Sequence, residues 1–205
     1  MAAAGCYPEE VNNVAELDVV ATFDDKSMDW STVGTYLLPD EVVDLSEILE
    51  IEDPIDLPDE YDEFILASVE AELRGLGWTA LSQEAIGRGE IPDVLVLVGK
   101  VASENMAVGI GYPWWGYWGW YPWYPGWPCQ VGCYPTYPGV PVSYTWEMGT
   151  LVVDIIDVAR SDDESVHSAW LGGLNGVLSG SSNTQSRLAN GIQQAFDQSP
   201  YLAGN

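Results

Sequence analysis

A run of aliphatic residues, "VLVLV" from Val94 to Val98, constrains the fold more than any other feature of this sequence. Because no polar residue interrupts it, the run predicts a central strand that is covered on both faces. Turn residues in "GRGEIPD" precede the strand and set its start. If helices cover only one face of the sheet, another apolar segment has to cover the second face.

Two segments have the spacing of amphipathic helices. The first begins near Asp59, ends at Gly75 or Gly77, and places Tyr61, Ile65, Val69 and Leu73 on one stripe. The second spans 184–198, with Asn183 or Thr184 as its N-cap and Pro200 after its end. Its apolar face consists of Leu188, Ile192, Ala195 and Phe196. Both patterns predict helices that pack on a sheet.

Further strands are expected at 14–24, in "TVGTYLLP" up to Pro39, and at about 105–111. The segments "VPVSYTWEMGTLVVDIIDVA" and "SVHSAWLGGLNGVL" predict an antiparallel hairpin. Residues 40–56 are rich in acids, and Pro54 and Pro58 exclude one continuous helix through them, so we expect an irregular connection. The order predicts one α+β domain over 14–205, with a mostly antiparallel sheet and two amphipathic helices on one face.

Residues 112–139 are a second unusual feature, because they combine many aromatic side chains with many glycines and prolines. This composition excludes a helix and predicts a long hairpin-like insertion. Three roles are open: a cover for the sheet, a surface that binds glycans or peptides, and a surface for assembly or membrane contact. The candidate binding or assembly residues are Trp114, Trp115, Tyr117, Trp118, Trp120, Tyr121, Trp123, Tyr124 and Trp127.

The charge of the chain limits its partners. It has 32 acidic and 6 basic residues and a formal net charge of -26. Such a surface repels phosphate backbones and anionic headgroups, so we expect no nucleic-acid partner. No stretch is apolar and long enough to span a bilayer, so we expect membrane attachment only through a lipid anchor.

The three cysteines suggest an oxidising compartment outside the cytoplasm. "AAGC", ending at Cys6, is similar to the end of a bacterial lipobox, whose cysteine becomes lipidated, so residues 1–13 would form a tether; the alternative is an ordinary exposed cysteine. Cys129 and Cys133 in "CQVGC" can close a small disulfide in a periplasm. The odd cysteine would then be the lipidation site.

The sequence offers few candidate catalytic residues. His167 is the single histidine, and nothing near it in the sequence supports a role as a general base. Two cysteines and one distant histidine do not supply a zinc site, so we expect no metal and no cofactor. Asp154 and Asp157 lie three apart on one predicted strand, which sends them to opposite faces. A pair of more distant acids beside an aromatic platform stays open as glycosidase chemistry.

Four segments together resemble a family of bacterial envelope lipoproteins, domain-of-unknown-function family 4136. They are "DDKSMDWSTVGTYLLP", then "ELRGLGW" followed by "PDVLVLV", then "GTLVVDIIDVARSDDESVHSAWLGG", and finally "RLANGIQQAFDQSP". The resemblance covers most of residues 14–202, and the third segment is similar to the hallmark hairpin of the family. Two features depart from it: the acidic stretch 40–62, and Leu171 directly after Trp170.

The resemblance implies a lipid-anchored outer-membrane protein with an α+β fold, and it carries no established activity or catalytic residue. We therefore expect a non-enzymatic envelope lipoprotein that acts as a structural or interaction module and associates with itself or with another envelope protein through the aromatic segment. The alternative is a protein that binds glycans, or less readily hydrolyses them, with the same rings.

Overall fold

The computed structural model describes residues 19–46, 59–101, 134–136, 149–161, 165–178 and 183–204. Its strands are β1 (Val19–Asp24), β2 (Thr35–Leu37), β3 (Val43–Asp44), β4 (Thr79–Ala80), β5 (Val94–Val101), β6 (Tyr134–Thr136), β7 (Thr150–Asp157) and β8 (Ser165–Asn175). The α-helices are α1 (Asp62–Gly75), α2 (Gln83–Gly87) and α4 (Thr184–Asp197), and the 3-10 helices are η2 (Trp30–Thr32), η3 (Asp59–Tyr61) and η4 (Pro200–Ala203).

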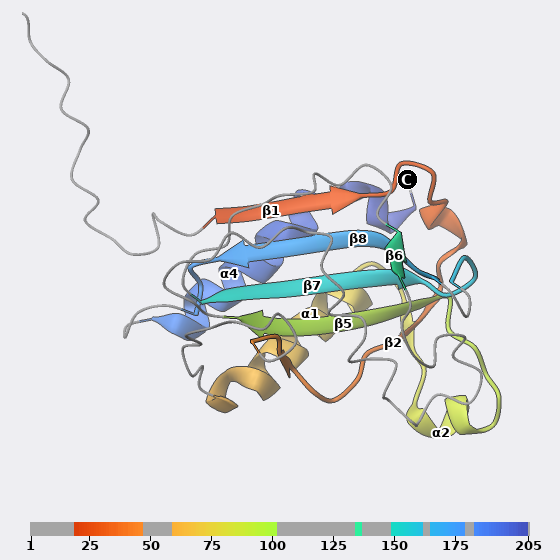
Figure 1. Ribbon diagram of the computed structural model, residues 1–205, viewed down its shortest axis with the longest axis horizontal. Helices are drawn as coiled ribbons and strands as arrows, with labels where there is room; N and C mark the ends of the chain where they lie inside the picture. Colours follow the sequence, from red (N-terminus) through yellow and green to blue (C-terminus); the bar gives the residue numbers. More distant parts are fainter. Residues whose placement is uncertain are drawn as a thin grey trace, which may run out of the picture.

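The strands form one eight-stranded sheet with the order β1-β8-β7-β5-β2-β4, in which β3 also pairs with β5 and β6 with β8 (Figure 1). Its long members β1, β8, β7 and β5 are antiparallel, with Val94 opposite Asp157 and Leu151 opposite Leu174. The short strands at its margins join in parallel. The predicted α+β class, the mostly antiparallel sheet and the β7–β8 hairpin are therefore confirmed.

Asp93 explains why the short strand β2 runs parallel to β5. Its Oδ2 accepts hydrogen bonds from the backbone N–H of Gly34 at 2.9 Å and from the N–H and Oγ1 of Thr35, both at 2.8 Å. In return, the Thr35 hydroxyl accepts a hydrogen bond from the Asp93 N–H at 3.0 Å. These bonds hold the start of β2 beside the start of β5.

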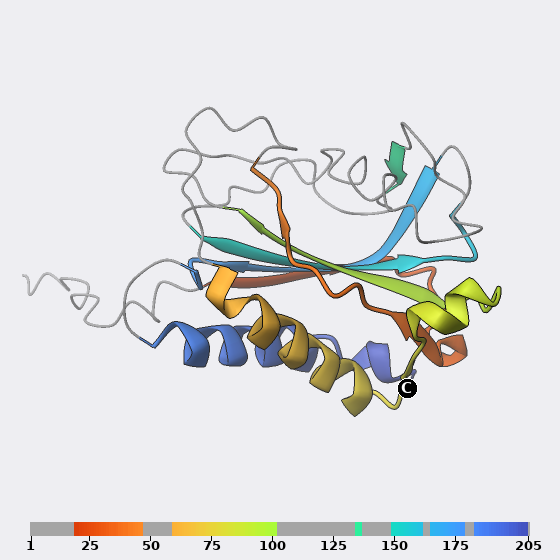
Figure 2. The same cartoon turned by 90° about the horizontal axis from the view of Figure 1, so that it is seen from below.

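Both long helices lie on one face of the sheet, as the two apolar stripes predict (Figure 2). Ile65, Val69 and Leu73 of α1 are completely buried, as is Leu188 of α4, and Ile192 of α4 is nearly so. They join one core with alternate residues of the strands: Val94, Val96 and Val98 of β5, Leu151, Val153 and Ile155 of β7, and Trp170 and Leu174 of β8. This core holds the helices on the sheet.

The approach of α4 to the sheet depends on small residues. Trp170 is buried, packs on Phe196 with ring centroids 5.3 Å apart, and donates its indole N–H to Ser199 Oγ at 2.8 Å. A Cβ at Gly172 would lie 2.5 Å from the Trp170 ring, and a Cβ at Gly191 would lie 2.8 Å from Leu174 Cδ2. Glycine at these positions lets the indole and the helix pack closely against β8.

The face of the sheet opposite the helices is buried as well. Leu95 and Leu97 of β5 and Val152 and Ile156 of β7 have their side chains out of solvent, although they do not belong to the helix-side core. All eight residues of β5 are buried. The prediction of a central strand covered on both faces is therefore confirmed.

Lys100, near the end of β5, is a charged residue inside this apolar strand. Its Nζ lies 2.6 Å from Asp59 Oδ1 and 2.9 Å from Asp62 Oδ1, and only 2% of its side chain is exposed. One carboxylate from η3 and one from the first residue of α1 thus pair with a buried ammonium and tie these helices to β5.

Some elements differ from the sequence-based expectations. The prediction missed β4 and α2, because both are short and lack a periodic apolar pattern. The acidic connection contains the two-residue strand β3. Asn183 is the N-cap of α4, but it has φ 63° and its side chain makes no capping hydrogen bond. The strand expected at 105–111 and the tether 1–13 lie outside the described residues.

Candidate functional site

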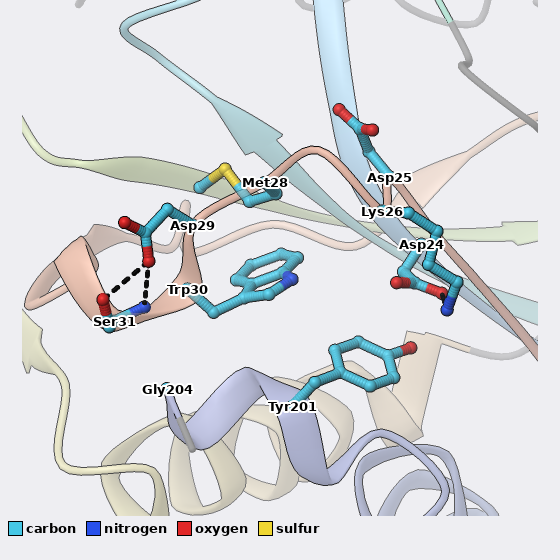
Figure 3. Close-up of a pocket in the computed structure, with 9 residues that line it drawn as sticks. All are labelled: Asp24, Asp25, Lys26, Met28, Asp29, Trp30, Ser31, Tyr201 and Gly204. Carbon is cyan, nitrogen blue, oxygen red and sulfur yellow. Dashed lines mark hydrogen bonds and ion pairs between the residues drawn. The ribbon is translucent and has the colours of Figure 1, made fainter.

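A pocket of about 420 Å³ lies where β1 ends, between the β1–η2 loop, η2 and η4 (Figure 3). The described residues that line it are Asp24, Asp25, Lys26, Met28, Asp29, Trp30, Ser31, Tyr201 and Gly204. Three carboxylates, one ammonium and two aromatic rings therefore surround one space. We treat this pocket as the candidate functional site of the described part of the chain.

Local hydrogen bonds shape the loop that carries the acids. Asp25 Oδ1 accepts the backbone N–H of Ser27 at 2.8 Å, as in the turns that aspartate favours. Asp29 caps η2, because its Oδ1 accepts the Ser31 N–H at 3.2 Å and the Ser31 hydroxyl at 2.6 Å. Gly204 has φ 71°, and a Cβ there would lie 2.9 Å from Ser31 Cα, so glycine allows the end of η4 to pack on η2.

Aromatic rings form one wall of the pocket. The Trp30 ring stacks on that of Trp78, with centroids 6.2 Å apart and planes 11° apart. Tyr201 is tilted against Trp30 with a centroid distance of 6.4 Å. Because Trp30 is buried and Tyr201 is half-buried, the Tyr201 ring is the aromatic surface that a ligand can reach.

Lys26 is the basic residue of the pocket. Its Nζ lies 2.6 Å from Asp24 Oδ1 and 5.2 Å from the centroid of the Tyr201 ring. The hydrogen bond to Asp24 raises the pKa of Lys26 above its ordinary value. The ammonium thus has both a carboxylate and a ring face as partners, the combination that proteins use to hold cations.

Asp25 forms the back of the pocket and links its own loop to two segments that are distant in the sequence. Its Oδ2 lies 2.6 Å from Arg160 Nη1 and 2.9 Å from His167 Nε2, and the Ser27 hydroxyl donates to its Oδ1 at 2.8 Å. Arg160 Nε in turn pairs with Asp157. Burial alone would raise the pKa of Asp25, but the hydrogen bonds from His167, Ser27 and Arg160 hold it well below the ordinary range.

The spatial order of Ser27, Asp25 and His167 indicates that these residues have a structural role. Asp25 lies between the Ser27 hydroxyl and the His167 ring, whereas a catalytic triad places the imidazole between the hydroxyl and the carboxylate. Both carboxylate oxygens of Asp25 already accept hydrogen bonds. The cluster therefore fixes the β1–η2 loop to β8 and to the turn after β7.

Sequence reasoning did not find this cluster. His167 is 142 residues from Asp25 in the chain, and no local pattern joins them. Asp154 and Asp157 do not converge: Asp154 accepts a hydrogen bond from Ser168 at 2.8 Å, and Asp157 pairs with Arg160. Among the described residues, no group of three or more His, Cys, Asp or Glu is arranged to hold a metal ion.

The cysteines and the aromatic residues make up the remaining predicted sites. Cys6, Cys129, Cys133 and the nine aromatic residues from Trp114 to Trp127 lie outside the described residues. The described portion of the aromatic segment, β6, pairs in parallel with Ser165–His167 at the start of β8. In the part of the chain that the structure describes, no helix has the length and apolar character needed to cross a membrane.

Solved structures with the same overall arrangement exist. A DUF4136 family protein from Bacteroides thetaiotaomicron is 22% identical, with a TM-score of 0.63, and the match covers 92% of this chain and 98% of that one. This similarity shows the shared fold.

Two further structures are more distant. A PelC dodecamer from Paraburkholderia phytofirmans is 11% identical, with a TM-score of 0.40 and coverage of 87% and 94%. A PDZ domain protein from Parabacteroides distasonis is 13% identical, with a TM-score of 0.44 and coverage of 90% of this chain and 36% of that one. Both scores are too low to inform the assembly or activity of this chain.

The comparison of sequences agrees with the structural one. No curated protein matches the chain significantly. The profile described as "Domain of unknown function (DUF4136)" matches residues 19–201, which is most of the chain. The protein therefore belongs to the DUF4136 family.

Proposed function

We propose that this protein is a non-enzymatic lipoprotein of the bacterial cell envelope, and that it acts as a structural or interaction module. The observation that carries the proposal is the arrangement of Asp25, whose two carboxylate oxygens are occupied by donors from Ser27, Arg160 and His167. The most strongly perturbed acid of the pocket thus holds the fold together instead of serving as a free base. A surface of acids and rings around such a rigid frame suits recognition of a partner.

Self-association through the aromatic segment is the specific form of this proposal. Tryptophan and tyrosine side chains contribute most to the binding energy of protein interfaces, and the segment has six of the 10 tryptophans. Its strand β6 pairs with β8, which attaches the segment to the sheet. The net charge of -26 opposes close approach to anionic headgroups, so the rings serve protein contact in preference to membrane insertion.

The proposal includes the cellular location of the protein. A lipid on Cys6 would anchor the protein in the outer membrane, and a disulfide between Cys129 and Cys133 would form in the oxidising periplasm. The lipobox-like "AAGC" and the short cysteine spacing support this proposal. Mass spectrometry of protein extracted from the bacterial membrane, before and after reduction, tests both modifications.

The molar mass in solution tests self-association. We would measure light scattering of the wild-type chain and of a variant in which the six tryptophans of the segment, Trp114 to Trp127, are changed to serine. The matched control is Ile91→Ser, because Ile91 is a large apolar side chain that is 71% exposed in the described part of the chain. We expect an oligomer for the wild type and for Ile91→Ser, and a folded monomer for the tryptophan variant.

The opposite result identifies a different role for the rings. A wild-type monomer whose tryptophan variant unfolds would contradict self-association and make the segment a cover for the sheet. Glycan binding is the alternative function, because the same rings can stack on sugar faces. Retention of a folded wild-type monomer on a polysaccharide column, with loss of retention in the tryptophan variant, would favour that alternative.

A further inference from the structure

We propose that the pocket at the end of β1 binds the ammonium group of a lysine side chain from a partner protein, in the position that the Lys26 ammonium now occupies. The inference rests on the proposed function only in that the protein works through partners. It concerns a surface of β1, η2 and η4 and does not use the aromatic segment.

The pocket already holds one ammonium group, that of Lys26, between a carboxylate and an aromatic ring. Lys26 Nζ is 2.6 Å from Asp24 Oδ1 and 5.2 Å from the centroid of the Tyr201 ring. The carboxylate supplies a charged hydrogen-bond acceptor, and the ring face attracts the cation through its quadrupole. Figure 3 shows Lys26 and Asp24 on one side of the space and the Tyr201 ring beside them. An alkylammonium of the same shape fits this position because Lys26 does.

Lys26 is held in a way that permits replacement. Its side chain is 81% exposed, whereas the side chain of Lys100 is only 2% exposed and contacts two carboxylates. An exposed ion pair contributes little to stability, because water and salt screen it and the long side chain loses entropy when it is held. Lys26 can therefore leave the pocket without disturbing the fold, while Lys100 cannot.

The charge balance of the pocket favours a cation at the position of Lys26. Arg160 neutralises Asp25 from behind the pocket, at 2.6 Å. Asp24 and Asp29 then remain as acids against the single charge of Lys26. Asp29 is exposed and uses only Oδ1 to hold Ser31, so among the described residues its Oδ2 accepts no hydrogen bond and faces solvent. The net charge of -26 also steers a cationic partner toward the surface.

The size of the space also fits a side chain. A volume of about 420 Å³ accommodates an extended lysine side chain together with part of its backbone. Met28 and the Tyr201 ring give the alkyl stem an apolar wall, while Asp24 lies at the position of the charge. A phosphate or carboxylate ligand would instead meet acids. The lining therefore selects a cation with an apolar stem.

The test uses the fact that the chain has only two lysines, Lys26 and Lys100. The wild-type protein is labelled with lysine that carries 13C at Cε and is titrated with Nα-acetyl-lysine N-methylamide at constant ionic strength. We expect a saturable shift of the Lys26 resonance, because its ammonium leaves the Tyr201 ring, and no shift of Lys100. The same probe acetylated at Nε is the matched control, and it should produce no shift. An unmoved Lys26 resonance, or an equal shift with the acetylated probe, would overturn the proposal.

Variants locate the binding of a 13C-labelled probe in the pocket. Lys26→Ala removes the competing ammonium and should tighten binding by about two- to fivefold, the range expected for exposed ionic and cation–π contacts. Asp24→Asn should weaken it by a similar factor. Arg88→Ala changes the net charge by the same amount as Lys26→Ala at a residue that does not line the pocket, so it should leave affinity unchanged. Equal tightening in Lys26→Ala and Arg88→Ala would indicate general attraction only and would contradict the site.

The two proposals fail separately. Light scattering decides self-association through the tryptophans, and the lysine probe decides the pocket. An oligomeric protein whose Lys26 resonance does not respond leaves the assembly proposal intact and removes the pocket proposal. A monomeric protein whose Lys26 resonance responds removes the assembly proposal and leaves the pocket proposal intact.

Discussion

Arg160, in the turn after β7, places its Nη1 2.6 Å from Oδ2 of Asp25, 135 residues earlier in the chain. The same carboxylate oxygen lies 2.9 Å from His167 Nε2 on β8. The β1–η2 loop, which lines the pocket, is thus held by the nearly buried carboxylate of Asp25, whose partners lie on two other segments. The shape of the pocket depends on this ionic cluster.

Asp25→Asn should destabilise the protein. It removes the charge that pairs with Arg160 while it keeps the size of the side chain, and loss of hydrogen bonds to a charged group costs about 2 kcal/mol. Urea denaturation at neutral pH measures the free energy of unfolding. Glu90→Gln is the control, because Glu90 and Arg88 form an exposed pair, and it should leave the stability nearly unchanged. Equal stability of the two variants would contradict a structural role for Asp25.

The contribution of Asp25 should depend on pH in one direction. Its folded-state pKa lies below the ordinary value, so its contribution is complete above the unfolded pKa of about 3.9 and is lost as the pH falls through the folded pKa. The difference in unfolding free energy between wild type and Asp25→Asn should be constant near neutral pH and shrink in acid. Denaturation curves across that range measure it, and a difference that grows in acid would refute the assignment.

Asp154→Asn should stabilise the protein at neutral pH. Asp154 is completely buried on β7, its Oδ1 accepts a hydrogen bond from Ser168, and its Oδ2 has no partner among the described residues. Burial raises its pKa well above the ordinary value, although the bond from Ser168 opposes the rise. Because the folded pKa is raised, stability falls as the pH rises from the unfolded toward the folded pKa, and Asn removes this loss.

The size and pH range of this effect can be measured. At pH 7 we expect Asp154→Asn to be more stable than wild type, because the buried aspartate must either lose its solvation as an anion or take up a proton on folding, and asparagine does neither. The gain should disappear near the ordinary pKa of an aspartate. Ser168→Ala, which removes the opposing hydrogen bond, should extend the loss of stability to higher pH in the wild-type background. Parallel pH profiles for wild type and Asp154→Asn would argue against a raised pKa.

Gly172→Ala should destabilise the contact between β8 and the helix layer. The added Cβ would lie 2.5 Å from Trp170, whose ring is held by Phe196 and by the hydrogen bond to Ser199. Overpacking of a fixed core costs about 2 kcal/mol. Gly75→Ala, at the end of α1 with nothing within 4 Å of the new Cβ, is the matched control and should be neutral or slightly stabilising. Thermal unfolding compares the two, and a neutral Gly172→Ala would mean that the ring can move.

The sequence by itself determined the features that depend on short-range patterns. The uninterrupted run from Val94 to Val98 predicted a strand buried on both faces, and all of β5 is buried. The spacing of Ile65, Val69 and Leu73 predicted the buried stripe of α1. Such patterns succeed because the burial of a residue within its own element follows the period of that element. The segments that resemble domain-of-unknown-function family 4136 also identified the family correctly.

Only the tertiary structure decided which distant groups meet. Asp25 contacts Arg160 and His167 because β1, β8 and β7 are neighbours in the sheet. No local pattern of the sequence encodes that order. Lys26 lies over the ring of Tyr201 for a similar reason, because η4 packs beside the end of β1. The pattern of one segment reports which face it buries, whereas ion pairs and pockets depend on the positions of several segments at once, which are fixed by the packing of the whole core.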